Sequence, residues 1–524
     1  MRPTSLLAAL PLAPSFDFDS ACSLSVLSLL ESQLGLPTKF AEASVVPAGS
    51  NLTFPDVDPS CVMNAPPILI PSDICRIRLQ VETSSSSRIK MEAWLPRSWT
   101  GRFLSTGNGG LAGCIQYPDM AYAASLGFAT VGANNGHDGS SGALLAESPE
   151  VLADFAYRSI HTNVIIGKNI TREFYGEAHT KSYYLGCSTG GRQGLKSVED
   201  FPEDFDGVVA GAPATQFVTL LSYFGHFYSE ITGDPSQPTF IPGPTWTGLI
   251  HNDILAQCDK IDGVEDGIIE DPNACDYDPS RLLCTDGQND NCLTPTQVES
   301  VRQSFSPFFN STGDLVFPRA QPGGEDFLSQ LANGTPFILT SEWFKYVVYN
   351  DSSLDPTKIR LSDYEYAIKQ NPFNIETFKG DLRPFDSRGG KLLMYHGQVD
   401  GLITPRSAEV YYDHAKEVSS GNLDDFYRLF RISGLGHCFF GPGAWLIGQG
   451  AGGPLDADKN ILMAAVRWVE EGMAPETIEG VKYVDDDASK GVAFSRKHCR
   501  WPLRTTYDGQ GDPNKPESWS CEAV

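Results

Sequence analysis

Two short stretches, far apart in the chain, each place a residue type used in catalysis next to a cysteine. Residues 186–190 read Gly-Cys-Ser-Thr-Gly, and residues 436–438 read Gly-His-Cys. A disulfide bond between Cys187 and Cys438 would hold their Cα atoms about 4.4–6.8 Å apart and set Ser188 beside His437. A serine hydroxyl becomes a good nucleophile when a base within about 2.6–3.2 Å takes its proton. The two stretches therefore predict a serine nucleophile and a histidine base held together by a covalent bond.

The serine stretch also matches a specific backbone turn. Gly-x-Ser-x-Gly is the nucleophile elbow of α/β-hydrolases, a sharp turn from a strand into a helix. Residues 182–185 predict a buried strand before the serine, residues 191–198 a helix after it, and residues 206–213 the next strand. A glycine-rich turn with an idle serine is the alternative, and the order strand, elbow, helix, strand favours the nucleophile.

An acid is needed to orient the histidine, and Asp400 is the candidate. In α/β-hydrolases the chain order is serine, acid, histidine. Asp400 follows the apolar strand predicted at 391–396 and precedes a helix predicted at 405–419, and catalytic groups gather at this edge of an open sheet. The alternative is an ordinary Asp-Gly turn. His396 is a rival base, but it lies inside the strand, where a buried core histidine is expected.

A glycine-rich loop at 107–110 suggests how the negative charge of the reaction is stabilised. The sequence Gly-Asn-Gly-Gly follows a short strand predicted at 102–106. Acyl transfer needs two donors for its oxyanion, usually backbone N–H groups. Thr189, directly after the nucleophile, and either Gly109 or Gly110 are the predicted donors. A phosphate-binding loop is a rival interpretation, but the Lys-Ser/Thr pair that continues such a loop does not follow residues 107–110. A simple tight turn is the remaining alternative.

A cluster of carboxylates at 259–268 suggests a cation site. Three aspartates within eight residues repel each other when they lie close together, unless a cation sits between them, and oxygen ligands with glycine turns suit calcium. The spacing does not match an EF-hand. A solvated acidic turn is the alternative.

These motifs together resemble the tannase and feruloyl esterase family of secreted esterases. The resemblance rests on the Cys-Ser, Asp and His-Cys motifs, on residues 186–196 and 107–110, and on the aspartate cluster, and it extends over nearly the whole chain. It implies an α/β-hydrolase fold with a large inserted lid domain and a serine triad of Ser188, Asp400 and His437. It also implies a structural calcium ion in the lid, bound by the carboxylates of Asp259, Asp262 and Asp266 and the carbonyls of Val264 and Ile268.

The resemblance further implies how the twelve cysteines pair. The number is even, which suits an oxidising compartment, and no Cys-x-x-Cys pair suggests zinc. One sequence cannot define the pairing by itself. The pairs implied by the family are Cys22–Cys75, Cys61–Cys114, Cys187–Cys438, Cys258–Cys275, Cys284–Cys292 and Cys499–Cys521.

The motifs divide the chain into three segments. Residues 1–215 and 389–524 are predicted to form the two parts of the catalytic domain, and residues 216–388, which lack a strand–helix alternation, an inserted lid with the calcium site. The insertion would rise over the edge of the sheet and cover Ser188. Further elements are predicted at 77–82, 88–95 and 128–133 as strands, 150–175 as a helix, 425–432 as a strand and 458–471 as a helix.

Composition narrows the class of protein. The chain has 524 residues and a net charge of −26, which argues against nucleic acid or an anionic membrane as a partner. No run of about eighteen apolar residues predicts a membrane span. Residues 6–13 form a short apolar stretch behind Arg2 that resembles a minimal signal peptide, and five Asn-x-Ser/Thr sequons suit a glycosylated secreted protein: Asn51, Asn169, Asn310, Asn333 and Asn350.

The sequence thus predicts a secreted, extracellular serine carboxylic ester hydrolase without an organic cofactor. The expected substrate is a hydroxycinnamate ester, such as feruloyl groups on plant cell-wall polysaccharides. Tannase is the alternative, although the Lys-Arg pair at which many fungal tannases are cut is absent from 216–388. An inactive hydrolase fold serving as a secreted binding protein is the alternative of another class. The oligomeric state is left open, and the acyl pocket is assigned only to candidate lid aromatics that could equally form the lid core: Tyr223, Phe224, Trp246 and Trp343.

Overall fold

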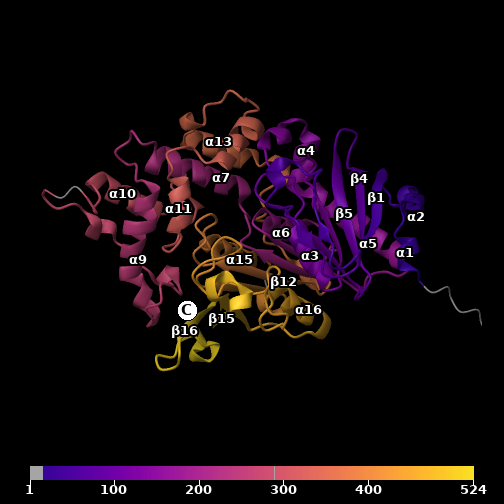
Figure 1. Cartoon of the computed structure of the whole chain (residues 1–524). Coiled ribbons are helices and arrows are strands. Elements are labelled where there is room, and N and C mark those ends of the chain that lie inside the picture. Colours follow the sequence, from indigo (N-terminus) through magenta and orange to yellow (C-terminus); the bar gives the residue numbers. More distant parts are fainter. Residues whose placement is uncertain (1–15, 288–289, 420, 524) are drawn as a thin grey trace, which may run out of the picture.

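A nine-stranded mixed sheet forms the centre of the protein (Figure 1). The structure is a computed structural model and describes residues 16–287, 290–419 and 421–523, so the apolar stretch at 6–13 lies outside the described residues. The sheet order is β1-β4-β5-β7-β6-β8-β9-β12-β13. Its strands are β1 (Thr38–Val46), β4 (Ile74–Glu82), β5 (Arg88–Pro96), β6 (Arg102–Thr106), β7 (Ala129–Ala133), β8 (Lys181–Cys187), β9 (Gly207–Gly211), β12 (Lys391–Gly397) and β13 (Tyr427–Ile432).

The parallel half of this sheet brings the candidate site residues to one edge. From β7 to β13 all neighbouring strands are parallel. Cys187 at the end of β8 pairs in register with Gly211 at the end of β9, and Gly397 at the end of β12 pairs with Ile432 at the end of β13. The loops that follow β6, β8, β12 and β13 therefore leave the same edge, where open α/β sheets bind their ligands.

Helices cover both faces of the sheet. They are α3 (Tyr117–Ser125), α5 (Ser159–Tyr175), α6 (Thr189–Asp200), α15 (Arg406–Ser419) and α16 (Ile461–Glu471). The helix predicted at 150–175 is present as α4 (Pro149–Ala153), a π-helical segment (Asp154–Arg158) and α5. The helix predicted from 458 starts later, because the Asn460 side chain accepts a hydrogen bond from Met463 N–H and caps α16 there.

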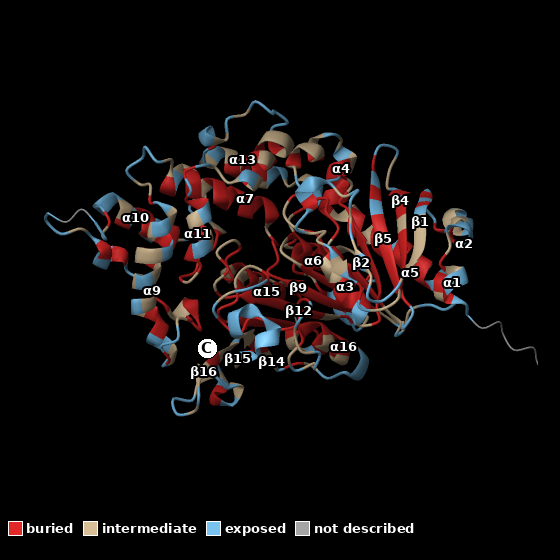
Figure 2. Cartoon of the chain, in the orientation of Figure 1, coloured by how far each residue is buried: buried red, intermediate tan, exposed pale blue. Residues whose placement is uncertain are grey.

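Residues 216–388 add no strand to the nine-stranded sheet and form a mainly helical layer beside it (Figures 1 and 2). Its elements are α7 (Phe217–His226), α8 (Gly243–Thr245), α9 (His251–Cys258), α10 (Pro295–Ser304), β10 (Phe308–Phe309), β11 (Leu315–Phe317), α11 (Glu325–Leu331), α12 (Ile338–Glu342), α13 (Leu361–Gln370) and α14 (Arg383–Ser387).

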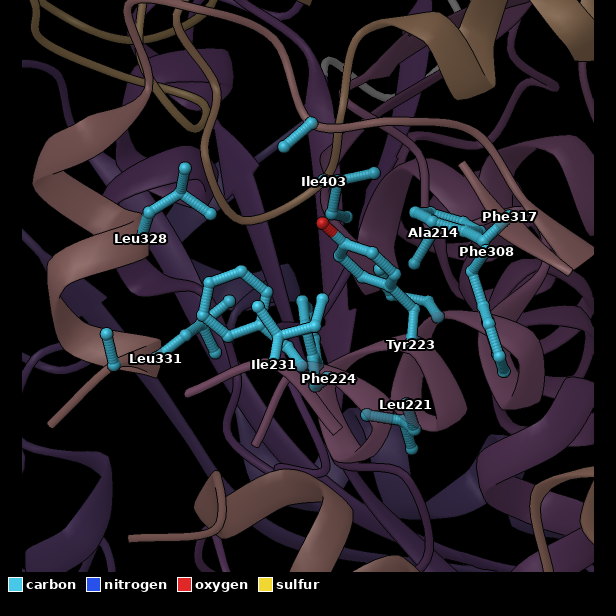
Figure 3. Packing of buried hydrophobic residues seen from close by; sticks show 14 of the residues in the cluster. Ala214, Leu221, Tyr223, Phe224, Ile231, Phe308, Phe317, Leu328, Leu331 and Ile403 are labelled. Atoms are coloured by element: carbon cyan, nitrogen blue, oxygen red, sulfur yellow. The ribbon is translucent and has the colours of Figure 1, made fainter. Parts of the chain in front are cut away.

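The hydrophobic core of this layer extends beyond the insertion itself. Tyr223, Phe224, Trp246 and Trp343 all lie in one buried cluster. The same cluster includes apolar side chains from 111–156, together with Ala214 and Ile403. Figure 3 shows the Tyr223 hydroxyl directed toward Ile403, among aliphatic side chains. All three predicted segments thus contribute to one core.

Several elements lie outside the sequence prediction. Strand β1 joins the sheet edge antiparallel to β4, with a bulge between Phe40 and Glu42 that breaks its alternation. The C-terminus folds into two hairpins, and the Cys499–Cys521 disulfide bond links them. The remaining elements are α1 (Phe18–Ala21), α2 (Leu24–Leu27), β2 (Asn51–Leu52), β3 (Ile68–Leu69), β14 (Thr477–Tyr483), β15 (Val492–Cys499), β16 (Leu503–Tyr507) and β17 (Trp519–Ala523).

The helix behind the elbow packs against β9 with no room for a side chain at Gly191. A Cβ added there would lie 2.9 Å from Pro213 Cα and closer still to the carbonyl oxygen of Gly211. We expect Gly191→Ala to lower the free energy of unfolding by about 1–3 kcal/mol, because both obstructing atoms belong to the backbone. Urea unfolding measures the change. Gly248→Ala is the matched control, since a Cβ there meets no atom within 4 Å; an equal loss in both variants would contradict the packing argument.

Candidate active site

Ser188 occupies a strained turn between β8 and α6. Its backbone has φ 65° and ψ −125°, a conformation that is costly for a residue with a side chain. The turn is fixed by a hydrogen bond of 3.0 Å from Ser188 N–H to Gly211 O. The turn packs closely against the loop after β6, and both contribute a glycine to the contact. A Cβ on Gly107 would lie 2.6 Å from Gly190 Cα. This is the geometry predicted for a nucleophile elbow, and it leaves Ser188 partly exposed.

Asp400 contacts the histidine on the loop that follows β13. The Nδ1 atom of His437 lies 2.8 Å from Asp400 Oδ2, while Oδ1 accepts hydrogen bonds of 2.9 Å from the N–H groups of Leu402 and Ile403. Burial alone would raise the pKa of Asp400, but His437 and His396 beside it hold the pKa well below its usual range. An ionised Asp400 accepts a hydrogen bond from the N–H at Nδ1 and leaves Nε2 of His437 free to act as a base.

His396 has the buried position expected from the sequence. It is fully buried, and its Nε2 lies 2.8 Å from the carbonyl oxygen of Ile403 and 3.2 Å from Asp400 Oδ2. Because a carbonyl oxygen only accepts, Nε2 carries the proton and faces the acid. His396 thus supports Asp400 from inside the sheet and does not line the pocket that contains Ser188.

The Cys187–Cys438 disulfide bond brings the serine and the histidine into one pocket. The two Cα atoms lie 6.0 Å apart across a sequence separation of 251 residues. Ser188 and His437 both line a pocket of about 460 Å³, and no hydrogen bond joins Ser188 Oγ to His437 Nε2 within the part of the chain that the structure describes. The six disulfide bonds of the structure join the pairs that the sequence resemblance implied.

Backbone N–H groups suitable for an oxyanion hole lie beside the serine. Among the described residues, the N–H groups of Gly109, Gly110 and Thr189 have no hydrogen-bond acceptor. The Thr189 hydroxyl donates to Gly110 O at 2.9 Å and joins the two loops. Asn108 anchors the glycine loop through bonds of 2.9 Å from its amide to the carbonyls of Cys114 and Ala133. Free donors on an anchored backbone are what oxyanion stabilisation requires.

The pocket has lining residues that the sequence argument missed. Gln116, Pro118 and Asp119, at the start of α3, line it together with Leu339 from α12 and Leu402 from the loop after β12. Tyr223, Phe224, Trp246 and Trp343 are not among its lining residues and belong to the core of the insertion. No motif marks Gln116 or Asp119; their place in the helix after the glycine loop is the only signal in the sequence.

The aspartate cluster forms a compact turn in which one carboxylate oxygen lacks a partner. Asp259 accepts a hydrogen bond from Gly267 N–H at 3.1 Å, and Asp262 Oδ1 accepts one from Val264 N–H at 2.9 Å. Asp262 Oδ2 is buried without a partner, and Asp266 pairs with Arg496 at 2.8 Å. Within the described ranges, no group of three or more His, Cys, Asp or Glu side chains is arranged to hold a metal ion.

Comparison with known proteins places this geometry in a family. A family model described as tannase and feruloyl esterase matches residues 74–522. The chain belongs to this family. A relative from Aspergillus fumigatus named probable feruloyl esterase B-2 is 50% identical over 484 residues, which cover 91% of this chain and 91% of the relative.

Solved structures agree with this family membership. The crystal structure of feruloyl esterase B from Aspergillus oryzae matches with a TM-score of 0.91 at 44% identity, covering 96% of this chain and 100% of that one. Tannin acyl hydrolase from Aspergillus niger matches with a TM-score of 0.74 over 96% of both chains. At 22% identity, that second match shows the shared α/β fold alone.

The disulfide bond beside the serine leads to a prediction that separates stability from chemistry. We expect replacement of both Cys187 and Cys438 by Ala to lower the free energy of unfolding by about 2–5 kcal/mol. We also expect kcat to fall by about 10²-fold well below the melting temperature, since about 1 Å of misplacement costs that much. Circular dichroism and ester hydrolysis at one temperature measure both effects.

The matched control replaces Cys284 and Cys292, whose bond spans only 8 residues within the insertion. This control should keep its kcat. A folded Cys187/Cys438 variant with the kcat of the parent protein would mean that packing alone positions His437.

Proposed function

We propose that this protein is a serine carboxylic ester hydrolase of the feruloyl esterase type, which releases hydroxycinnamic acids from plant cell-wall polysaccharide esters. One observation carries the proposal: His437, which contacts Asp400 at 2.8 Å, lines the same pocket as Ser188 on its strained turn. The relative that is 50% identical and the solved structure that is 44% identical are both named feruloyl esterase B.

The residues suggest acyl-enzyme catalysis. Nε2 of His437 takes the proton of Ser188 as its Oγ attacks the ester carbonyl, and Asp400 stabilises the resulting imidazolium. The N–H groups of Thr189 and of Gly109 or Gly110 stabilise the tetrahedral oxyanion. His437 then protonates the departing alcohol. Water attacks the acyl-enzyme by the same path, which releases the acid and restores Ser188.

Three observations favour a hydroxycinnamoyl esterase over tannase and over an inactive binding protein. Met63, Leu339 and Leu402 supply apolar side chains to the pocket, which suits a hydroxycinnamoyl ring. Tannase activity has weaker support, because the tannin acyl hydrolase match is only 22% identical. The intact arrangement of Ser188, His437 and Asp400 also argues against an inactive binding protein on this fold.

A substrate panel tests this function. We expect the protein to hydrolyse methyl ferulate and methyl p-coumarate with higher kcat/KM than methyl gallate. Ser188→Ala and His437→Ala should each lower kcat by about 10⁴-fold or more, and the double variant should be little worse, because the two residues act as a unit. His414→Ala, on α15, is the control for loss of a histidine. A preference for methyl gallate would favour tannase, and near-full activity in Ser188→Ala would overturn the nucleophile assignment.

We further propose an α/β-hydrolase catalytic domain, formed by residues 1–215 and 389–524, with residues 216–388 as its lid. The insertion leaves the sheet after β9 and returns at β12, two neighbouring strands that lie between β8, which precedes Ser188, and β13, which precedes the His437 loop. Leu339 from the insertion lines the same pocket as Gln116 and Pro118. A lid in this place shields the bound substrate from bulk water.

We also propose that the aspartate turn binds a structural calcium ion. The carboxylates of Asp259, Asp262 and Asp266 and the carbonyls of Val264 and Ile268 would hold it, and the ion would stabilise the turn without taking part in the chemistry. The unpartnered, buried Asp262 Oδ2 supports this fit, since such an oxygen is costly unless a cation or donor meets it. The Cys258–Cys275 bond closes the chain around the turn.

Chelation tests the calcium proposal. We expect exhaustive chelation to lower the melting temperature of the protein, and calcium to restore it. Asp262→Ala should lower the melting temperature by itself and respond no further to chelator. Glu265→Ala is the control from the same turn, because Glu265 is exposed and pairs only with exposed Lys260. If the purified protein contains no calcium and chelator leaves its melting temperature unchanged, the calcium proposal is wrong and residues 259–268 form an ordinary acidic turn.

Secretion and glycosylation are part of the same proposal. Six disulfide bonds suit an oxidising extracellular compartment. In the described part of the chain, no helix has the length and apolar character of a membrane span. The sequon residues Asn51, Asn333 and Asn350 are exposed, as glycan attachment requires.

A further inference from the structure

The pocket around Ser188 is lined by side chains of two chemical kinds. Leu339 and Leu402 are apolar, whereas Gln116 and Asp119, at the start of α3, are polar. Gln116 lies beside the loop proposed to bind the oxyanion, because a Cβ added at Gly109 would be 3.6 Å from its Nε2 atom. At least one of the polar side chains therefore lies close to the proposed oxyanion donors.

The carboxyl group of Asp119 has no partner in the part of the chain that the structure describes. Among the described residues, no hydrogen bond or ion pair involves its carboxyl group or the side-chain amide of Gln116. The buried carboxylate of Glu92, by comparison, pairs with Arg76 at 2.6 Å. Burial raises the pKa of Asp119 to about 7, so the group is largely a neutral carboxylic acid at mildly acidic pH.

Among the residues that the structure describes, the tyrosine hydroxyls near Asp119 form no hydrogen bond with it either. Besides burial, the charge of Asp119 helps to raise the pKa of three tyrosines near it: Tyr122 on α3, Tyr184 on β8 and Tyr395 on β12. The Tyr122 hydroxyl donates to Gly448 O at 3.0 Å, and the Tyr184 hydroxyl donates to Gly190 O at 2.6 Å. Burial raises the pKa of Tyr122 to about 12. An unpaired carboxyl group in a pocket is costly for folding, and such groups mark functional sites.

We propose that Asp119, assisted by Gln116, binds a hydroxyl group of the ester substrate and so places the ester carbonyl over Ser188. A neutral carboxylic acid both donates to and accepts from a hydroxyl group, and the amide of Gln116 does the same. The inference rests on the proposed esterase function, and it names the residues that determine the substrate specificity of that function. Two parts of the substrate carry such a group: the phenol of the acyl ring and the sugar of the alcohol.

A substrate–variant comparison tests this and identifies the source of the hydroxyl. The substrates are methyl ferulate, methyl 3,4-dimethoxycinnamate, methyl cinnamate and a feruloylated arabinose. Asp119→Leu should lower kcat/KM by about 10–100-fold on substrates that carry the bound hydroxyl, because the hydroxyl is then left in the pocket without its hydrogen-bond partner. It should change the remaining substrates little. Asp119→Asn should recover much of the loss.

The pattern of losses decides between the two sources. A loss on methyl ferulate that disappears with the dimethoxy ester identifies the phenol. A loss confined to feruloylated arabinose identifies the sugar. Asp326→Leu, which alters an exposed aspartate in the first turn of α11, is the control and should behave like the parent protein.

The pH profile is a second readout that does not depend on Asp119→Leu being folded. An ionised Asp119 cannot donate and adds a negative charge near the oxyanion. Therefore kcat/KM on the sensitive substrate should be highest below pH 7 and fall as the pH rises through about 7. Asp119→Asn stays neutral and should lose this descending limb.

Equal losses on all four esters, methyl cinnamate included, together with an unchanged pH profile in Asp119→Asn, would overturn the inference and leave the esterase function intact. Failure of the parent protein to hydrolyse any of the four esters would overturn the proposed function and this inference with it.

Discussion

The covalent bond between Cys187 and Cys438 is the constraint on which the arrangement of the site depends. It joins the end of β8 to the loop after β13, which lie on different sides of β9 and β12 in the sheet. The strained serine follows one of its cysteines and the histidine precedes the other. The bond also encloses the whole insertion within a single covalent loop. Chain entropy in the unfolded state, and not packing alone, therefore favours the geometry of the site.

Asp400 connects this constraint to the interior of the sheet. It accepts hydrogen bonds from two backbone N–H groups and contacts one imidazole on each side, His437 at the pocket and His396 in β12. A carboxylate with so many donors is ionised and has little freedom to rotate. The orientation of His437 is consequently fixed by the backbone that follows β12 as much as by its own loop.

The sequence predicts the parallel half of the fold well, because buried parallel strands are continuous apolar runs. Residues 391–396 are such a run, and β12 occupies Lys391–Gly397. Strand β1 escapes prediction because its bulge interrupts the alternation of buried and exposed residues. The aromatic residues of the insertion illustrate a different limit: whether Tyr223 or Trp343 lines a pocket or fills a core depends on tertiary packing. Asp119 has no motif at all, and only the approach of α3 to the elbow makes it part of the site.

The shared hydrophobic core has a consequence for exchanging parts between relatives. Residues 216–388 pack against apolar side chains from 111–156, such as Leu145 and Phe155, in a single cluster. A chimera that takes only the insertion from another esterase would combine two parts of one core that come from different proteins. Their side chains did not evolve to pack against each other. Transplanted segments should therefore include 111–156, which also contain the pocket-lining residues Gln116 and Asp119. The set of residues that would have to be exchanged together is thus discontinuous in the chain.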